Sequence, residues 1–222
     1  MKIFVVIPLF NEEKHIVKVL KDIFKYKLPV IIVDDGSRDS SKSKIRNLKL
    51  KNVVFLEHKV NLGKGAAMKT GADYAFDRGA NAVIFMDSDG QHEATDLPKF
   101  VKELKSGNCD VVFGSRNLNF GVPLIRYLGN KMASVFVHFL FKIYVSDLVS
   151  GFRALTHRGY KKIKWDSTGY GVETEMVIRT AKAGIKYCEI PVETIYYDKV
   201  KGVTILDAFG IFADVLKWKL TK

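Results

Sequence analysis

The stretch Ala82-Val83-Ile84-Phe85-Met86-Asp87-Ser88-Asp89-Gly90-Gln91 joins five apolar residues to a turn that carries two carboxylates and an amide. A short, continuous apolar run is typical of a strand buried on both faces of a parallel sheet. The oxygens of Asp87, Asp89 and Gln91 suit Mg²⁺ or Mn²⁺, cations that often share their ligands with substrate phosphates. The stretch therefore favours an α/β fold and a nucleotide-linked substrate, although Asp, Ser and Gly also form ordinary turns.

Strand-like and helix-like segments alternate on both sides of this stretch. The expected strands cover residues 2–9, 30–33, 53–57, 82–86 and 110–113, and the expected helices cover residues 12–24, 61–77 and 96–105. Short buried strands separated by helices predict a mainly parallel sheet flanked by helices on both faces. The length of 222 residues suits one domain. We therefore predict a single α/β domain over residues 1–222.

Polar residues follow four of the expected strands. They form the segments Pro8–Glu12, Asp34–Ser37, Asp87–Gln91 and Gly114–Arg116. Open parallel sheets bind their ligands beyond the carboxyl ends of the strands, so we expect these segments to form one site. A further loop, Asn61–Gly65, places Lys64 between two glycines at the expected start of a helix. The glycines either let the backbone approach a ligand, to which Lys64 adds positive charge, or only form a loop and the start of a helix.

Two segments of the second half combine a wide apolar face with a narrow polar stripe. In residues 127–145 the stripe consists of Lys131, Ser134, His138 and Lys142. In residues 204–219 it consists of Asp207, Gly210, Asp214 and Lys217. Each pattern predicts a helix that is either buried in the core or lies in a membrane interface with its apolar face in lipid. A second subunit is another possible partner for these faces.

Composition narrows the class of protein. The net charge of +12 favours anionic partners, namely nucleotides, nucleic acid or an acidic membrane surface. The basic residues are not interleaved with aromatic residues as in an RNA-binding sheet, which disfavours a nucleic-acid-binding module. Cys109 and Cys188 show no metal-ligand spacing, so we interpret them as reduced thiols of an intracellular protein. No apolar run approaches the roughly 20 residues of a membrane span.

The ordered motifs together resemble the family 2 glycosyltransferases of the GT-A fold. The resemblance rests on residues 8–13 (PLFNEE), 34–37 (DDGS), 61–65 (NLGKG), 87–91 (DSDGQ) and 114–116 (GSR), and it covers nearly the whole chain. It implies a GT-A (Rossmann-like) catalytic domain, with residues 1–116 binding the nucleotide sugar and residues 117–222 binding the acceptor. The dinucleotide-binding, Walker and serine-hydrolase motifs are absent from the sequence, which agrees with this assignment.

Residues 146–153 (SDLVSGFR), after the first amphipathic segment, look like those of the dolichyl-phosphate mannose or glucose synthases. That resemblance implies a metal-dependent, inverting transfer of a hexose-type sugar from a UDP- or GDP-linked donor to a polyprenyl phosphate. It also implies a cytoplasmic enzyme peripherally associated with the membrane, because the sequence does not continue into transmembrane helices. A glycosyltransferase with a non-lipid alcohol acceptor and a basic nucleic-acid-binding module are the alternatives.

The resemblance also assigns roles to individual residues. Pro8, Asn11, Glu12 and Asp35 would border the base and ribose, Asp87 the ribose or sugar, and Lys199 or Lys201 the diphosphate. Asp89 and Gln91 would ligate Mg²⁺ or Mn²⁺, while Arg116, Arg126 and Arg153 would bind the acceptor phosphate or orient the site. Glu173 and Glu175 would bind sugar hydroxyls, or would only favour the start of a helix. Of these, Asp89, Arg116, Arg126 and Glu173 are the expected catalytic residues.

An acceptor phosphate makes a strong general base unnecessary. A phosphate monoester is already anionic near neutral pH, whereas an alcohol acceptor must lose a proton as it attacks. We therefore expect direct displacement at the anomeric carbon, in which the protein aligns two anions and the metal stabilises the leaving diphosphate. The identity of the sugar, the base and the polyprenyl chain stays open at this point.

Overall fold

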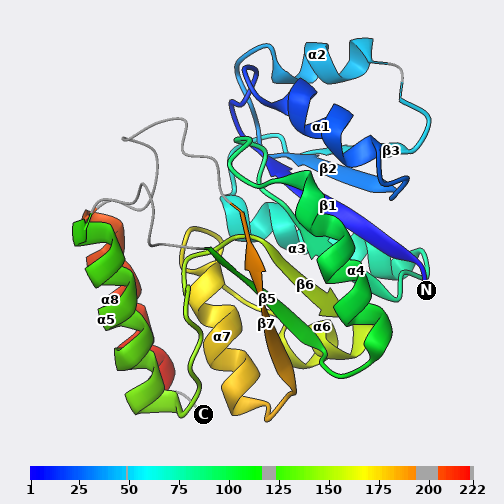
Figure 1. The fold of residues 1–222 in the computed structure, drawn as a ribbon. Coiled ribbons are helices and arrows are strands. Elements are labelled where there is room, and N and C mark those ends of the chain that lie inside the picture. Colours follow the sequence, from blue (N-terminus) through cyan, green and yellow to red (C-terminus); the bar gives the residue numbers. More distant parts are fainter. Residues whose placement is uncertain (49, 117–123, 194–204, 221–222) are drawn as a thin grey trace.

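The computed structural model describes residues 1–48, 50–116, 124–193 and 205–220, and its side chains from 124 to 127 and from 205 to 209 are outside the description. A central sheet is covered by helices (Figure 1). Its strands are β1 (Ile3–Leu9), β2 (Val30–Asp34), β3 (Val53–Glu57), β4 (Ala82–Phe85), β5 (Val111–Arg116), β6 (Arg153–Thr156) and β7 (Tyr187–Val192). The helices are α1 (Ile16–Phe24), α2 (Ser41–Asn47), α3 (Lys64–Asp77), η1 (Ala94–Asp96), α4 (Leu97–Ser106), α5 (Leu124–Phe141), α6 (His157–Ile163), α7 (Val172–Lys182) and α8 (Ile205–Leu220).

The sheet has the strand order β3-β2-β1-β4-β6-β5-β7, and every neighbouring pair is parallel except those of β6. Strand β6 runs antiparallel to both β4 and β5, with Arg153 paired to Phe85 and to Phe113. Because of this reversal, the loop that enters β6 lies at the edge where β4 and β5 end. The expected mainly parallel α/β fold is confirmed, with this one reversed strand inside it.

The core occupies both faces of the sheet. Strand β1 illustrates the division, since successive side chains of a strand point to opposite faces. Val6 packs in one apolar cluster with residues of α3, α6 and α7, while Val5 and Ile7 pack in the other with residues of α1 and α4. All seven residues of β1 are buried, which explains why its sequence is almost continuously apolar.

Helices α5 and α8 lie side by side at one end of the sheet, next to α7 (Figure 1). Their contact includes Phe136 and Phe212, whose rings stack with centroids 4.8 Å apart. The expected helix over residues 127–145 ends earlier, because Lys142 adopts a left-handed conformation with φ of 59°. The following residues Ile143 and Val145 are buried outside any helix.

The expected polar stripe of α5 is wrong at Ser134. This side chain is buried, as is that of Asn130 one turn earlier. The buried side of α5 therefore carries polar groups. The exposed face of α5 is instead largely apolar, and its large exposed side chains are Leu128, Met132, Val135 and Phe139. Phe212 and Leu216 are exposed on α8. We call these six residues the apolar stripe.

The interpretation of Cys109 and Cys188 as reduced thiols is also wrong, because the two residues form a disulfide. They are 79 residues apart in sequence, but β5 and β7 are parallel neighbours that bring their Cα atoms to 5.9 Å. That separation is typical of a disulfide. Distance along the chain therefore misled the sequence interpretation. Within the described residues, no helix is both long enough and apolar enough to span a membrane.

Candidate active site

The turn after β4 brings together the oxygen ligands expected from the sequence. Asp87, Asp89 and Gln91 are all partly exposed at the carboxyl edge of the sheet. Gly90 adopts a φ of 77°, which glycine tolerates and which reverses the chain between Asp89 and Gln91. The backbone N–H of Gln91 donates to Asp89 Oδ1 at 2.9 Å. The turn is thus compact, with its carboxylates at the end of β4.

Lys64 at the start of α3 links this turn to α7. Its Nζ lies 2.8 Å from Asp87 Oδ1 and 2.7 Å from Glu173 Oε1. Burial alone would lower the pKa of Lys64, but the two carboxylates outweigh it and the pKa is raised. Burial alone would raise the pKa of Asp87, yet the ammonium outweighs it and the pKa is lowered. Lys64 and Asp87 are therefore both charged at neutral pH.

The loop before β6 closes over this triad. A Cβ atom on Gly151 would lie 2.6 Å from Asp87 Oδ2 and 2.7 Å from Lys64 Nζ, so a larger residue there would force the ends of these two side chains to move. Arg153 fixes the same loop, since its buried guanidinium donates to the carbonyls of Ser150, Leu148 and Glu173. Burial lowers the pKa of Arg153 to about 10. Arg153 is still cationic at neutral pH, and its hydrogen bonds to the carbonyls of Ser150 and Leu148 orient the loop.

Arg116, at the end of β5, points into the same region. Its Nε and a terminal nitrogen donate to the two carboxylate oxygens of Asp147, at 2.6 and 2.9 Å. Asp147 is fully buried and also accepts from Asn130 Nδ2 at 3.2 Å. A bidentate pair fixes the plane of the guanidinium. Nearby, Glu189 accepts hydrogen bonds from the backbone and hydroxyl of Ser146.

Asp35 follows β2 and organises the loop before α3. Its carboxylate accepts the backbone N–H groups of Leu62 and Gly63, at 2.9 and 2.7 Å. His58 Nδ1 lies 2.7 Å from the same carboxylate, and the other ring nitrogen is 3.0 Å from Thr70 Oγ1. With three partners and 2% exposure, Asp35 holds the loop in place.

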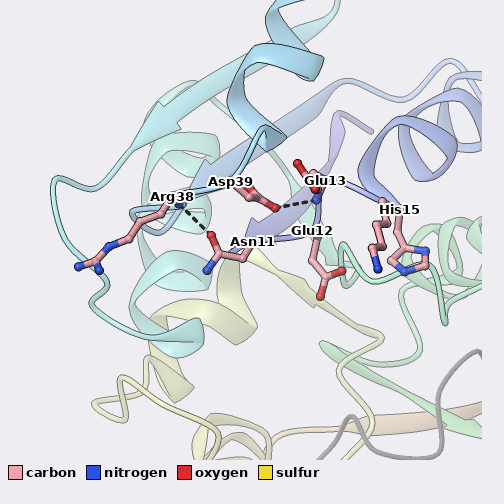
Figure 2. A pocket seen from close by; sticks show the side chains of 7 residues that line it. Asn11, Glu12, Glu13, His15, Arg38 and Asp39 are labelled. Atoms are coloured by element: carbon pink, nitrogen blue, oxygen red, sulfur yellow. Dashed lines mark hydrogen bonds between the residues drawn. The ribbon is translucent and has the colours of Figure 1, made fainter.

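A cavity of about 520 Å³ opens where the loop after β1 meets the loop after β2. Figure 2 shows the side chains that line it, among them Asn11, Glu12, Arg38 and Asp39. Asn11 adopts a left-handed φ of 52°, and its Oδ1 accepts the N–H of Arg38 at 2.8 Å. Asp39 accepts the N–H of Glu13 at 3.0 Å. These hydrogen bonds connect the loop after β1 with the loop after β2 and fix the rim of the cavity.

Comparison with known proteins identifies the family. The sequence model described as Glycosyl transferase family 2 matches residues 4–172. This chain belongs to that family. The glycosyltransferase is 31% identical to the UDP-N-acetylglucosamine--dolichyl-phosphate N-acetylglucosaminyltransferase of Methanococcus voltae, with 99% of this chain and 97% of the relative covered. It is 28% identical to the polyprenol monophosphomannose synthase of Mycolicibacterium smegmatis, over 85% of this chain and 75% of the relative.

A solved structure confirms the GT-A type of fold. Glucosyl-3-phosphoglycerate synthase of Mycobacterium tuberculosis, in complex with Mn²⁺, UDP and glucosyl-3-phosphoglycerate, matches with a TM-score of 0.73 at 20% identity. The alignment covers 99% of the glycosyltransferase and 78% of that chain. The family and the fold together establish a glycosyltransferase domain, as the sequence motifs predicted.

The two glycines around Lys64 have a different role from the one expected. A Cβ atom on Gly63 would lie 2.4 Å from the carbonyl oxygen of Thr168, and one on Gly65 would lie 2.2 Å from that of Ser167. Trp165 Nε1 also donates to the carbonyl of Gly65 at 2.9 Å. The glycines thus admit the glycosyltransferase's own loop before α7, whereas the sequence suggested that they admit a ligand.

Among the remaining predicted residues, Pro8 and Glu175 have side chains that the structure describes. Pro8 is buried in β1 beyond its last pair with β4, which is Val6 with Phe85. Glu175 accepts from the backbone N–H groups of Asp166 and Ser167 and from Arg179, so it fixes the loop before α7. Arg126 belongs to α5, but its side chain is outside the described residues, as are Lys199 and Lys201 altogether.

Two buried residues of the site escaped the sequence interpretation. Asp147 pairs with Arg116, and a signal for it was its position in residues 146–153, which carried the subfamily resemblance. His92 directly follows Gln91, and its Nδ1 accepts the N–H of Asp87 at 3.1 Å. Burial lowers the pKa of His92, even though Asp87 and Asp89 oppose that shift. The adjacency of His92 to Gln91 was the available signal.

The donor set at the turn fits a divalent cation. Asp89 and Gln91 offer hard oxygens at the open edge of the sheet, and Asp89 Oδ1 already receives the N–H of Gln91. Mg²⁺ and Mn²⁺ are held by such oxygens, with water and phosphate in the other positions. Among the described residues, one group of three carboxylate, thiol or imidazole ligands lies close together, and it is Glu103 with the two cysteines, which form the disulfide.

Proposed function

We propose that this glycosyltransferase moves a hexose-type sugar from a UDP- or GDP-linked donor to a polyprenyl phosphate, with inversion, at the cytoplasmic face of a membrane. The apolar stripe is the observation that carries the choice of acceptor. Met132 and Phe139 are each 72% exposed on α5, the helix that follows β5 and Arg116 along the chain. Two relatives of the chain are named for transfer to dolichyl phosphate or polyprenol phosphate.

The proposal places donor and acceptor on opposite sides of the Asp87–Gln91 turn. Asn11, Glu12 and Asp35 form or support the loops for the nucleoside, and the cavity rimmed by Asn11 and Arg38 offers the space. Asp89 and Gln91 would hold the divalent cation, which supplies positive charge to the departing diphosphate. Asp87, Lys64 and Glu173 would face the sugar.

The acceptor phosphate would bind near Arg116, with Arg126 as a further candidate, and Lys199 or Lys201 would neutralise the diphosphate. Asp147 holds the guanidinium of Arg116 in a fixed plane and carries a balancing negative charge. A phosphate oxygen forms the bond to the anomeric carbon while the bond from that carbon to the diphosphate breaks. The bonding electrons leave with the nucleoside diphosphate, and no proton has to move. Alignment of the two anions is the main task of the protein.

The membrane side of the proposal rests on the apolar stripe and its surroundings. The exposed residues Lys142, Lys217 and Lys219 lie at or near the ends of α5 and α8. A helix pair with an apolar outer face and flanking lysines suits the boundary between lipid headgroups and acyl chains. An acceptor that resides in a membrane would be reached from such a position. We therefore choose a lipid surface as the partner of the stripe.

The first test is a transfer assay. The protein is incubated with a panel of UDP- and GDP-sugars, Mg²⁺ or Mn²⁺, and a polyprenyl phosphate, and the lipid product is identified by mass spectrometry. We expect one donor to yield a polyprenyl phosphate sugar, and Asp89→Ala and Gln91→Ala to abolish the metal-dependent transfer. Transfer to a soluble alcohol but to no lipid phosphate would support the alternative acceptor class instead.

Vesicle flotation tests the membrane surface. Phe139→Asp should weaken binding to anionic vesicles by at least about tenfold, since inserting a phenylalanine side chain contributes roughly 1.5–3 kcal/mol and each 1.4 kcal/mol is tenfold. Asn108→Asp adds the same charge at an exposed position beside the disulfide and is the matched control. If the protein does not float, but forms a dimer that Phe139→Asp dissociates, the stripe is a subunit interface and the lipid assignment fails.

A further inference from the structure

His92 is a buried group of the site that the proposed reaction leaves unused. Its ring lies under the turn that carries Asp87, Asp89 and Gln91. Nδ1 accepts the backbone N–H of Asp87 at 3.1 Å. This hydrogen bond joins the residue that follows the turn to the first residue of the turn. With Nδ1 as the acceptor, the ring proton lies on Nε2, which is 3.8 Å from Asp87 Oδ2.

Stacking fixes the orientation of this ring. His92 stacks on Phe152, with centroids 4.8 Å apart and planes 19° from parallel. Phe152 in turn stacks on Phe100 of α4, with centroids 4.4 Å apart. The ring of His92 is thus held between the turn and the core, and Phe152 belongs to the Gly151 loop that closes over Asp87.

We propose that His92 is a positioning residue that holds the Asp87–Gln91 turn ready for the divalent cation. The ring acts through the backbone of Asp87, and it does not touch the substrate. The proposal rests on the proposed function for the identity of the bound group, a divalent cation with a nucleoside diphosphate. A turn closed before the cation arrives places Asp89 and Gln91 without further ordering. Groups that orient metal ligands typically change metal affinity or activity by about 10- to 100-fold.

Substitutions of His92 can separate the effect of its acceptor nitrogen from the effect of its stacked ring. His92→Asn keeps an acceptor near the place of Nδ1 but loses the stacking on Phe152. His92→Phe keeps the stacking but loses the acceptor, and His92→Leu loses both. His157→Phe is the matched control, because His157 also stacks on an aromatic ring, that of Phe76 with centroids 4.7 Å apart. It lies at the start of α6, and its side chain is in none of the site contacts described above.

The readout is binding of Mn²⁺, measured by the loss of the free-ion electron paramagnetic resonance signal, with UDP or GDP and without either. Thermal unfolding of each variant is recorded in parallel. We expect His92→Phe and His92→Leu to bind Mn²⁺ about 10- to 100-fold more weakly. His92→Asn and His157→Phe should stay within about threefold of the native protein, on the scale of that same effect.

Three results would overturn the proposal. Native-like Mn²⁺ affinity in a folded His92→Phe or His92→Leu protein would show that the acceptor is not needed. A folded His92→Asn protein that binds Mn²⁺ about tenfold more weakly than the native protein would assign the effect to the ring, and this result can be interpreted even if the apolar variants fail to fold. Absence of Mn²⁺ binding by the native protein with either nucleotide would refute the metal site of the proposed function, and the positioning role with it.

Discussion

Gly151→Ala tests whether the loop before β6 sets the geometry of the site. An ideal Cβ at this position would lie 2.6 Å from Asp87 Oδ2, 2.7 Å from Lys64 Nζ and 3.0 Å from Asp87 Oδ1. Comfortable contacts of a carbon atom begin near 3.5 Å, so one of the partners must move by about 1 Å. Asp87 and Lys64 form an ion pair, and Lys64 is also bound to Glu173, so the whole triad has to shift.

Activity should respond to this shift more strongly than stability. Overpacking a well-packed position typically costs about 1–3 kcal/mol. In a domain of this size, each kcal/mol lowers the melting temperature by about 2–4 °C. A misplacement of about 1 Å can lower the rate about 100-fold. We therefore expect a folded Gly151→Ala protein whose kcat/KM for the nucleotide sugar is lower by about two orders of magnitude.

The assay measures transfer of labelled sugar to a polyprenyl phosphate in detergent, alongside thermal unfolding. Gly129→Ala is the control, because nothing lies within 4 Å of a Cβ at that exposed helical position. Alanine there should stabilise α5 slightly and leave transfer unchanged. The reasoning is refuted if Gly151→Ala retains activity within about threefold of the native protein, or if its activity falls only in proportion to the unfolded fraction.

Three further predictions concern stability. Burial alone would raise the pKa of Asp110, but hydrogen bonds and the charge of Arg158 outweigh it and the pKa is lowered. The ionised carboxylate therefore stabilises the folded protein above its usual pKa of 3.8, and this stabilisation is lost as the pH falls through the lowered value. In acid titrations, the difference in stability between the native protein and Asp110→Asn should shrink below about pH 4. Reducing the disulfide should cost about 4.5 kcal/mol by the chain-entropy model for its 79-residue separation, and should expose two thiols to labelling that are absent before reduction. Arg153→Met should lower the urea midpoint by the equivalent of about 3 kcal/mol, because three buried carbonyls lose their donor, whereas an unchanged midpoint would contradict the orienting role of Arg153.

The first half of the fold was predictable because its strands carry local signals. Strands β1 to β5 are short apolar runs that are followed by polar turns, and all five lie within three residues of their predicted bounds. Strands β6 and β7 were not predicted. Strand β6 has only four residues and no alternation, and its antiparallel direction depends on pairing with β4 and β5, which are far away in sequence.

The site residues at the strand ends were predictable from the sequence, whereas the contacts between distant elements were not. Asp87, Asp89 and Gln91 share one turn, so their proximity follows from local sequence. The triad of Lys64, Asp87 and Glu173 joins three elements, and no local pattern reports such an ion pair network. The same limit explains the disulfide, since the pairing of β5 with β7 brings the cysteines together.

The reversed strand β6 explains how the two halves of the chain can act as one site. A parallel strand between β4 and β5 would place its entering loop at the opposite edge of the sheet. The antiparallel direction places residues 146–152 where β4 and β5 end, so Asp147 meets Arg116 while Gly151 meets Asp87 and Lys64. One short loop thus contacts both the proposed acceptor side and the donor side. Displacement of this loop is therefore expected to disturb both substrates together, and kinetic constants for donor and acceptor should change in parallel in Gly151→Ala.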